Sequence, residues 1–154
     1  MEIKETPDRK VLVVDDQYGN SENPMFPERY EGRVPGYTFL LEDAVEKHEK
    51  KPSQWDEGKL VDTPIFSSEK VLKRIRDEGN IVAILLDMDF GYDQKGYGLE
   101  IADALLQTFP EIPVFYFSSS KDYMDEARGY GVKIEWDHKL PSNNRLKEIL
   151  DSHT

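Results

Sequence analysis

Acidic side chains directly follow two apolar runs in this sequence of 154 residues. Asp15 and Asp16 come after the run Val-Leu-Val-Val, and Asp87 comes after Ile-Val-Ala-Ile-Leu-Leu, with Asp89 two positions further on. Runs of this kind, without a polar residue, are typical of parallel strands that are covered on both faces. Because the carboxyl ends of parallel strands meet at one edge of a sheet, we expect Asp15, Asp16 and Asp87 to lie close together.

A cluster of carboxylates favours two kinds of chemistry. Carboxylates at short range raise one another's pKa, and a divalent cation relieves that repulsion. A small set of oxygen ligands suits Mg²⁺, which keeps some of its waters. An aspartate can also act as the nucleophile in phosphoryl transfer and form an aspartyl phosphate. Taken singly, each acid equally fits a solvated turn residue or a helix cap, so only their combination favours a site.

Two further predicted strands lead to residues that suit the same chemistry. Ser118 follows an apolar run that ends at Phe117, and Lys139 lies three positions past Trp136, which ends a strand of alternating apolar and charged residues. The Lys139 ammonium can neutralise phosphoryl oxygens, and the Ser118 hydroxyl can donate a hydrogen bond to them. Four strand ends therefore bring acids, a hydroxyl or an amine to one edge of the expected sheet.

Short apolar strands and amphipathic helices alternate along the chain and must position these residues. Strands are expected at about residues 11–14, 60–66, 81–86, 113–117 and 132–136. Helices are expected at about residues 36–50, 67–77, 99–109, 121–130 and 143–151. Such alternation predicts an α/β fold in which a parallel sheet has helices on both faces.

Three segments of this pattern carry weaker signals. The helix at residues 36–50 is expected because apolar side chains such as Tyr37 and Leu40 recur at helical spacing. The strand at 60–66 contains Pro64, which suits an edge position. Residues 17–35 form a long loop without periodicity, and loops longer than about 12–15 residues are usually functional or disordered.

The composition excludes several classes of function. The chain has 20 Lys and Arg against 31 Asp and Glu, a formal charge of −11, which argues against a nucleic-acid backbone or an anionic membrane as its main partner. It contains no cysteine, so disulfides, thiolate zinc sites and cysteine nucleophiles are ruled out. No apolar run approaches the ~20 residues that a membrane helix needs, and no signal pattern precedes the first strand. We therefore expect a cytoplasmic protein with a single domain over residues 1–154 and an inserted loop at 17–35.

At these residues the sequence resembles the receiver domain of two-component response regulators. The match runs through residues 10–16, 84–89, 98–100, 112–119 and 136–139. It covers most of the chain except the long loop. The resemblance implies a flavodoxin-like fold, a doubly wound sheet of five parallel strands in the order 2-1-3-4-5.

The resemblance also implies a role for each acid at the sheet edge. Asp87 is similar to the aspartate that accepts the phosphoryl group in the family. Asp15 and Asp16 resemble the acidic pair that holds Mg²⁺, with Asp16 the more direct ligand. The backbone carbonyl of Asp89 would be the third protein ligand of the metal ion.

Three further residues match positions that respond to the phosphoryl group in the family. Ser118 resembles the switch hydroxyl, Lys139 the lysine that contacts the phosphate, and Trp136 the switch aromatic residue. By resemblance, the chain would receive its phosphoryl group from a sensor histidine kinase or a phosphotransfer protein. It would then bind a downstream effector, or a second copy, through its fourth helix, fifth strand and fifth helix. Neither a nucleic acid nor a membrane is an expected partner, and no enzymatic turnover is expected beyond self-phosphorylation and self-dephosphorylation.

The sequence departs from the family pattern in three places, and two other functions stay open. The loop at 17–35 and the segment at 91–97 are longer than usual, and the family's Lys-Pro pair reads Lys139-Leu-Pro here. Asp87-Met-Asp89 also resembles the nucleophile motif of haloacid-dehalogenase-like phosphatases. A degenerate receiver that binds partners without phosphorylation is the second alternative.

Overall fold

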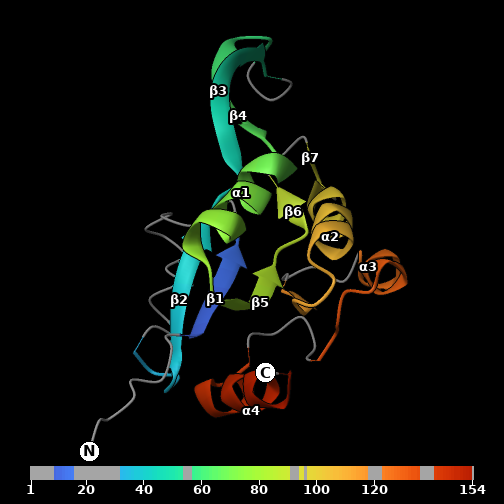
Figure 1. Cartoon of the computed structure of the whole chain (residues 1–154). Coiled ribbons are helices and arrows are strands. Elements are labelled where there is room, and N and C mark those ends of the chain that lie inside the picture. The colour runs from blue at the N-terminus through green and yellow to red at the C-terminus, as the bar shows by residue number, and fades with distance from the viewer. Residues whose placement is uncertain are drawn as a thin grey trace, which may run out of the picture.

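The fold is built around a parallel sheet. The computed structural model describes residues 9–15, 32–53, 57–90, 94–95, 97–117, 123–135 and 141–153. The four strands of the sheet are β1 (Arg9–Val14), β2 (Tyr37–Glu42), β5 (Ile81–Leu86) and β8 (Val114–Tyr116), in the order β2-β1-β5-β8. Figure 1 shows β2, β1 and β5 side by side. A parallel bridge between Phe115 and Lys133 continues the sheet beyond β8. This arrangement confirms the flavodoxin-like fold with strand order 2-1-3-4-5.

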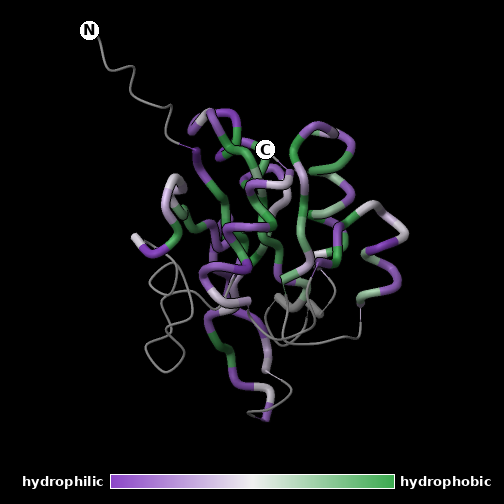
Figure 2. The backbone as a smooth tube through the Cα atoms, turned by 90° about the horizontal axis from the view of Figure 1, so that it is seen from below, coloured by the Kyte–Doolittle hydropathy of each residue, from purple (hydrophilic) through white to green (hydrophobic). Residues whose placement is uncertain are grey.

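Side chains that alternate along the strands build two hydrophobic cores, one on each face of the sheet. The described helices are α1 (Ser68–Glu78), α2 (Tyr97–Thr108), α3 (Met124–Tyr130) and α4 (Asn143–His153). One face packs against α1, α2 and α3, and the other packs against α4. The apolar segments of the central strands accordingly gather in the middle of the molecule (Figure 2). Both faces of β1 and β5 are covered over residues 11–14 and 81–86, which is why these two segments contain no polar residue.

Four of the five expected helices are confirmed, and their ends follow simple backbone chemistry. Gly79 ends α1, and Gly131 ends α3 in the left-handed conformation that glycine adopts without strain. The Ser142 side chain accepts a hydrogen bond from the Arg145 amide at 3.2 Å and so caps α4. No helix in the part of the chain that the structure describes is long and apolar enough to span a membrane.

The helix expected at residues 36–50 is wrong. These residues form β2 and then a further strand, β3 (Val45–Pro52). β2 lies beside β1 at the edge of the sheet, and the aromatic side chains of Tyr37 and Phe39 are buried on the α4 side. A short run with apolar side chains on both faces matches helical spacing as well as strand spacing, which explains the error. Ala44, with a φ of 61°, separates the two strands.

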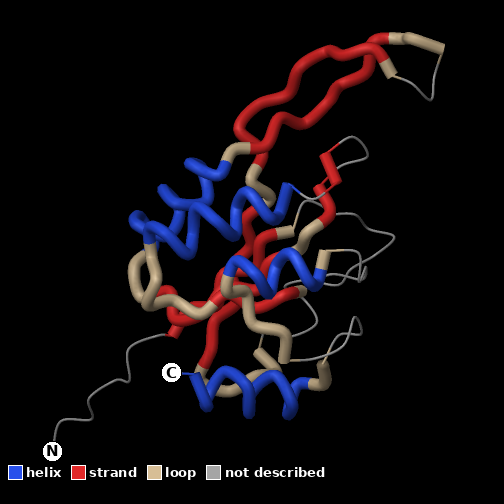
Figure 3. Tube along the Cα trace, turned by 90° about the vertical axis from the view of Figure 1, so that its right-hand side faces the viewer, coloured by secondary structure: helices blue, strands red, loops and turns tan. Residues whose placement is uncertain are grey.

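The second strand of the sheet is therefore β2 and not the segment at residues 60–66. The expected strand at 60–66 exists as β4 (Leu60–Phe66), but it pairs with β3 in a separate antiparallel hairpin. We call this hairpin, residues 45–66, the arm. It extends away from the rest of the molecule (Figures 1 and 3). A second, very short hairpin joins β6 (Asp89–Phe90) to β7 (Gln94–Lys95). Most of the expected loop at 17–35 lies outside the described residues.

Candidate functional site

The ends of β1 and β5 lie side by side at the carboxyl edge of the sheet. Val14 is paired with Leu86, and the Asp87 amide continues the ladder by donating to the Val14 carbonyl oxygen at 2.9 Å. Asp15 and Asp87 thus follow adjacent strand ends, about 4.8 Å apart between strands. The structure brings these two candidate residues together.

Asp87 is held tightly from the α2 side. Its exposed fraction is only 9%, and the Met88 side chain that follows is fully buried. The Gly98 amide, at the start of α2, donates to the Met88 carbonyl oxygen at 3.2 Å. A Cβ on Gly98 would overlap the Asp87 carbonyl oxygen and lie 2.5 Å from the Met88 Cα, so only glycine lets α2 approach this closely. The backbone that carries Asp87 is therefore fixed on both sides.

The strand β8 ends beside β5, directly before another candidate residue in the sequence. The Phe117 amide donates to the Leu86 carbonyl oxygen at 2.8 Å, so the chain leaves β8 beside the end of β5. Ser118, the next residue, lies outside the described residues, as do Asp16, Trp136 and Lys139. Asp89 is described only through its backbone, which pairs with Lys95. The roles expected for these five residues stay predictions.

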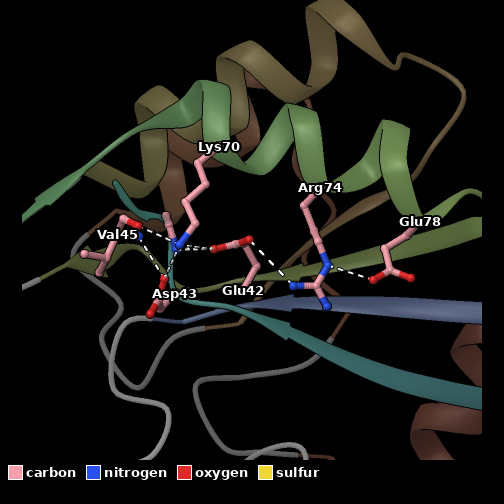
Figure 4. A network of polar contacts seen from close by, with 7 residues as sticks. Glu42, Asp43, Val45, Lys70, Arg74 and Glu78 are labelled. Carbon is pink, nitrogen blue, oxygen red and sulfur yellow. Dashed lines mark hydrogen bonds and ion pairs between the residues drawn. The ribbon is translucent and has the colours of Figure 1, made fainter. Parts of the chain in front are cut away.

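Glu42 is a buried acid at the same edge that the sequence analysis missed. It ends β2, its exposed fraction is 4%, and its carbonyl oxygen accepts the Asp15 amide at 3.1 Å. Its carboxylate accepts the Ala44 amide at 2.8 Å and lies 3.4 Å from the Lys70 ammonium and 3.9 Å from the Arg74 guanidinium (Figure 4). An apolar run followed by two acids marks both the end of β1 and the end of β2, and this signal was present in the sequence.

Asp43 joins the same network. Its carboxylate accepts the Val45 amide at 2.9 Å and the Lys70 ammonium at 3.0 Å, while Lys70 also donates to the Val45 carbonyl oxygen at 2.6 Å (Figure 4). Burial acts to raise the pKa of Asp43, but the Val45 amide and Lys70 outweigh it and hold that pKa below its usual value. Burial likewise acts to lower the pKa of Lys70, and the hydrogen bond to Asp43 and the charge of Glu42 raise it.

An open cleft of about 420 Å³ lies over this network. Its lining is formed by Phe39, Leu40, Leu41, Glu42, Asp43, Lys70 and Arg74. The two acids and two cations in this lining are already paired with one another. The network therefore fixes the end of β2 and the start of the arm to α1, and it is distinct from the pair formed by Asp15 and Asp87.

The donors at the ends of β1 and β5 fit a magnesium ion. They are carboxylate oxygens on neighbouring strands, and Mg²⁺ prefers one or two carboxylates together with waters. Among the described residues no three His, Asp or Glu side chains gather closely enough to form a metal site by themselves. Asp15 and Asp87 would supply two ligands of such a site, and Asp16 follows directly in the sequence.

Solved structures of receiver domains share this fold. A CheY-like receiver from Methanospirillum hungatei has a TM-score of 0.61 and 14% identity, over 95% of this chain and 96% of that one. A receiver domain protein from Clostridium thermocellum has a TM-score of 0.59 and 15% identity, over 94% and 93% of the two chains. TrrA from Thermotoga maritima, in complex with Mg²⁺ and BeF, has a TM-score of 0.59 and 16% identity, over 95% and 99%. The chain thus has the receiver fold.

The chain spans only about a quarter of one larger neighbour. NtrX from Brucella abortus, in complex with ADP, matches with a TM-score of 0.58 and 17% identity over 95% of this chain and 26% of that one. No protein-family model and no curated protein matches the sequence. The likeness therefore rests on the arrangement of strands and helices.

Proposed function

We propose that this chain is a receiver domain that accepts a phosphoryl group on Asp87. The observation that carries the proposal is the position of Asp87 in a receiver fold. It lies at the end of a central buried strand, beside Asp15 and almost enclosed. The donor is a phosphohistidine on a sensor histidine kinase or a phosphotransfer protein. In the transfer the P–N bond to the histidine breaks, a P–O bond to the Asp87 carboxylate forms, and the released imidazole nitrogen takes up a proton.

Asp15, Asp16 and Asp87, with the backbone carbonyl of Asp89, are the residues that would hold Mg²⁺. When bound, Mg²⁺ supplies positive charge against the oxygens of the transferring phosphoryl group. The pairing of the β1 and β5 ends supports this assignment, because it gives two carboxylates on neighbouring strands. The Mg²⁺ and BeF bound to TrrA support it by analogy.

The response to phosphorylation would involve Ser118, Lys139 and Trp136. A phosphoryl group adds negative charge, which the Lys139 ammonium and the Ser118 hydroxyl are suited to contact. Their recruitment would bias the surface that includes α3, the strand at Lys133 and α4, where a downstream effector or a second copy binds. We place the protein in the cytoplasm as a single receiver domain without enzymatic turnover, and with neither a nucleic acid nor a membrane as a direct partner.

Intact-mass analysis tests the proposal. Incubation with acetyl phosphate and Mg²⁺ should add one phosphoryl group to the protein and none to Asp87→Ala. Equal labelling of both proteins would place the phosphoryl group elsewhere. Absence of any label would favour a degenerate receiver, and steady phosphate release from phosphomonoesters would favour a phosphatase.

A further inference from the structure

The arm adds little to the hydrophobic core. Among its described residues only Phe66 is buried, and Leu60 is 64% exposed near the tip. Ordering a residue costs roughly 1–2 kcal/mol of conformational entropy, and an isolated two-stranded hairpin is marginally stable in water. The stability of the core therefore does not explain why the chain contains this hairpin.

The arm is nevertheless a regular structure. Its strands pair from Val45 opposite Phe66 to Pro52 opposite Leu60. An exposed ion pair crosses the ladder, with 3.0 Å between the Lys50 ammonium and the Asp62 carboxylate. Near the tip the Ser53 amide donates to the Lys59 carbonyl oxygen at 2.9 Å, and the Gly58 amide donates to the Ser53 carbonyl oxygen at 3.0 Å. A surface that is built in this way can present side chains to a partner in a fixed pattern.

The base of the arm is fixed to the acidic edge of the sheet. Lys70 of α1 donates to the Val45 carbonyl oxygen at 2.6 Å, and the Ser67 amide donates to the Ala44 carbonyl oxygen at 2.8 Å. Glu42, whose carboxylate accepts the Ala44 amide, also holds the Asp15 amide through its backbone carbonyl. The direction of the arm is thus set relative to the edge that carries Asp15 and Asp87.

The geometry of the sheet decides what can touch the arm. The arm leaves the sheet from β2, which lies two strands from β5. Because neighbouring strands are about 4.8 Å apart, the base of the arm lies ~10 Å from the strand that leads to Asp87. A protein interface of ordinary size covers ~800 Å² per partner, which corresponds to a disc with a radius of about 16 Å. A protein that is centred on Asp87 must therefore contact the base of the arm, whereas a small phosphodonor need not.

We propose that the arm is a docking element for the protein that donates the phosphoryl group to Asp87. This inference rests on the proposed function, and it names the partner of the same site. The occupant is a protein that carries a phosphohistidine. It contacts the base of the arm when it reaches Asp87, and from there it extends along the hairpin to the exposed side chains of Leu60, Lys51 and Lys59 near the tip.

An arm-deleted variant separates protein donors from small donors. Val45 and Phe66 face each other across the ladder, so replacing residues 46–65 by Asn-Gly closes the strands with a two-residue turn. The donors are acetyl phosphate and a panel of purified histidine kinases from the source organism, each labelled on histidine with radioactive ATP. Labelling by acetyl phosphate should stay within twofold of the intact chain. The rate of transfer from the kinase that labels the intact chain fastest should fall at least tenfold.

A point variant tests the same surface without removing the hairpin. Leu60→Asp places one negative charge at the exposed tip, and Asn80→Asp places the same charge at the opposite edge of the sheet, in the turn between α1 and β5. Transfer from the kinase should slow severalfold in Leu60→Asp and stay unchanged in Asn80→Asp. This pair keeps the test decisive if the arm-deleted variant does not fold.

The failure of this inference is distinguishable from the failure of the proposed function. If acetyl phosphate does not label Asp87 in the intact chain, the proposed function is wrong and the inference is withdrawn with it. If Asp87 is labelled but kinase transfer is equal with and without the arm, or no kinase labels the intact chain, the docking role is wrong. A dimer seen by light scattering that the arm deletion abolishes, with kinase transfer unchanged, would assign the arm to a second copy instead.

Discussion

Asp87 directly follows the last residue of β5, and its amide donates a hydrogen bond to the Val14 carbonyl oxygen at 2.9 Å. The backbone alone therefore fixes Asp87 beside the end of β1, whatever its side chain does. The Asp15 amide is held in the same way by the Glu42 carbonyl oxygen at 3.1 Å. Substitutions of either carboxylate should consequently leave the fold intact, so their effects on chemistry can be read directly.

The first prediction concerns the phosphoacceptor. Asp87→Asn should take no phosphoryl group from acetyl phosphate, while its melting temperature equals or exceeds that of the wild type, because one of the crowded carboxylates loses its charge. The readouts are intact mass and thermal unfolding. Asp77→Asn, at the exposed end of α1, is the control and should be labelled like the wild type. Full labelling of Asp87→Asn would show that another residue accepts the group.

The second prediction concerns the metal ion. A ligand at ~100 times its Kd stabilises the folded state by about 2.7 kcal/mol. The melting temperature of the wild type should accordingly rise with Mg²⁺, and Asp15→Asn should start equal or higher and rise less, because it has lost a ligand and a repulsive charge. A titration of unfolding against Mg²⁺ measures both. A wild type that does not respond to millimolar Mg²⁺ would count against the site.

The central strands could be predicted because burial on both faces leaves a clear mark in the sequence. Runs such as Ile81–Leu86 contain no polar residue, and the acid that follows each run then lies at a known edge of the sheet. Neither the spacing nor the composition distinguished β2 from a helix, since the apolar positions of residues 37–45 satisfy both periods. What decided between them was long-range pairing with β1, which no local pattern reports.

One strand of the arm, at residues 60–66, was expected, but β3 and its pairing with β4 could not be predicted for a different reason. A hairpin that stands outside the core buries few side chains, so its strands show no clean apolar alternation, and β3 is mostly charged. Charged segments are expected in loops or on helix surfaces. The role of Glu42 was hidden because placing residues 36–50 in a helix removed it from the sheet edge.

The third prediction concerns the close approach of α2 to the loop after β5. A Cβ at Gly98 would lie 2.5 Å from the Met88 Cα, so Gly98→Ala should push α2 and the backbone of Asp87 apart. Overpacking of this kind typically lowers the free energy of unfolding by about 1–3 kcal/mol. We expect that loss in urea unfolding, together with slower labelling by acetyl phosphate.

Gly129 provides a matched control for Gly98. It lies within α3, and a Cβ there would meet no atom within 4 Å. Alanine in place of an exposed helical glycine stabilises by roughly 0.5–1 kcal/mol, so Gly129→Ala should raise stability and leave labelling unchanged. Equal behaviour of the two alanine variants would mean that α2 adapts to the extra methyl group without moving Asp87.

The last prediction concerns the pH dependence of the Asp43 and Lys70 pair at the base of the arm. The pKa of Asp43 is lowered in the folded protein, since the Val45 amide and Lys70 outweigh the opposing effect of burial. A carboxylate with a lowered folded pKa stabilises the protein above its unfolded pKa of about 3.9, and that stabilisation is lost as the pH falls through the lower, folded value. Asp43→Asn should therefore be less stable than the wild type at pH 7, and the difference should narrow as the pH falls below about 4.

Lys70 predicts a loss of stability at high pH, where Asp43 predicts one at low pH. Its folded pKa is raised by Asp43 and Glu42 against the effect of burial, so its contribution is present below the unfolded pKa of about 10.4 and is lost as the pH rises through the higher, folded value. Because both side chains are partly exposed, the pair should contribute no more than ~1 kcal/mol. Urea unfolding of wild type, Asp43→Asn and Lys70→Gln at pH 3, 7 and 11 measures the free energy of unfolding at both ends of the pH range. Asp77→Asn is the exposed control. A difference in this free energy between wild type and Asp43→Asn that stays constant from pH 7 to pH 3 would show that the pair does not hold the arm.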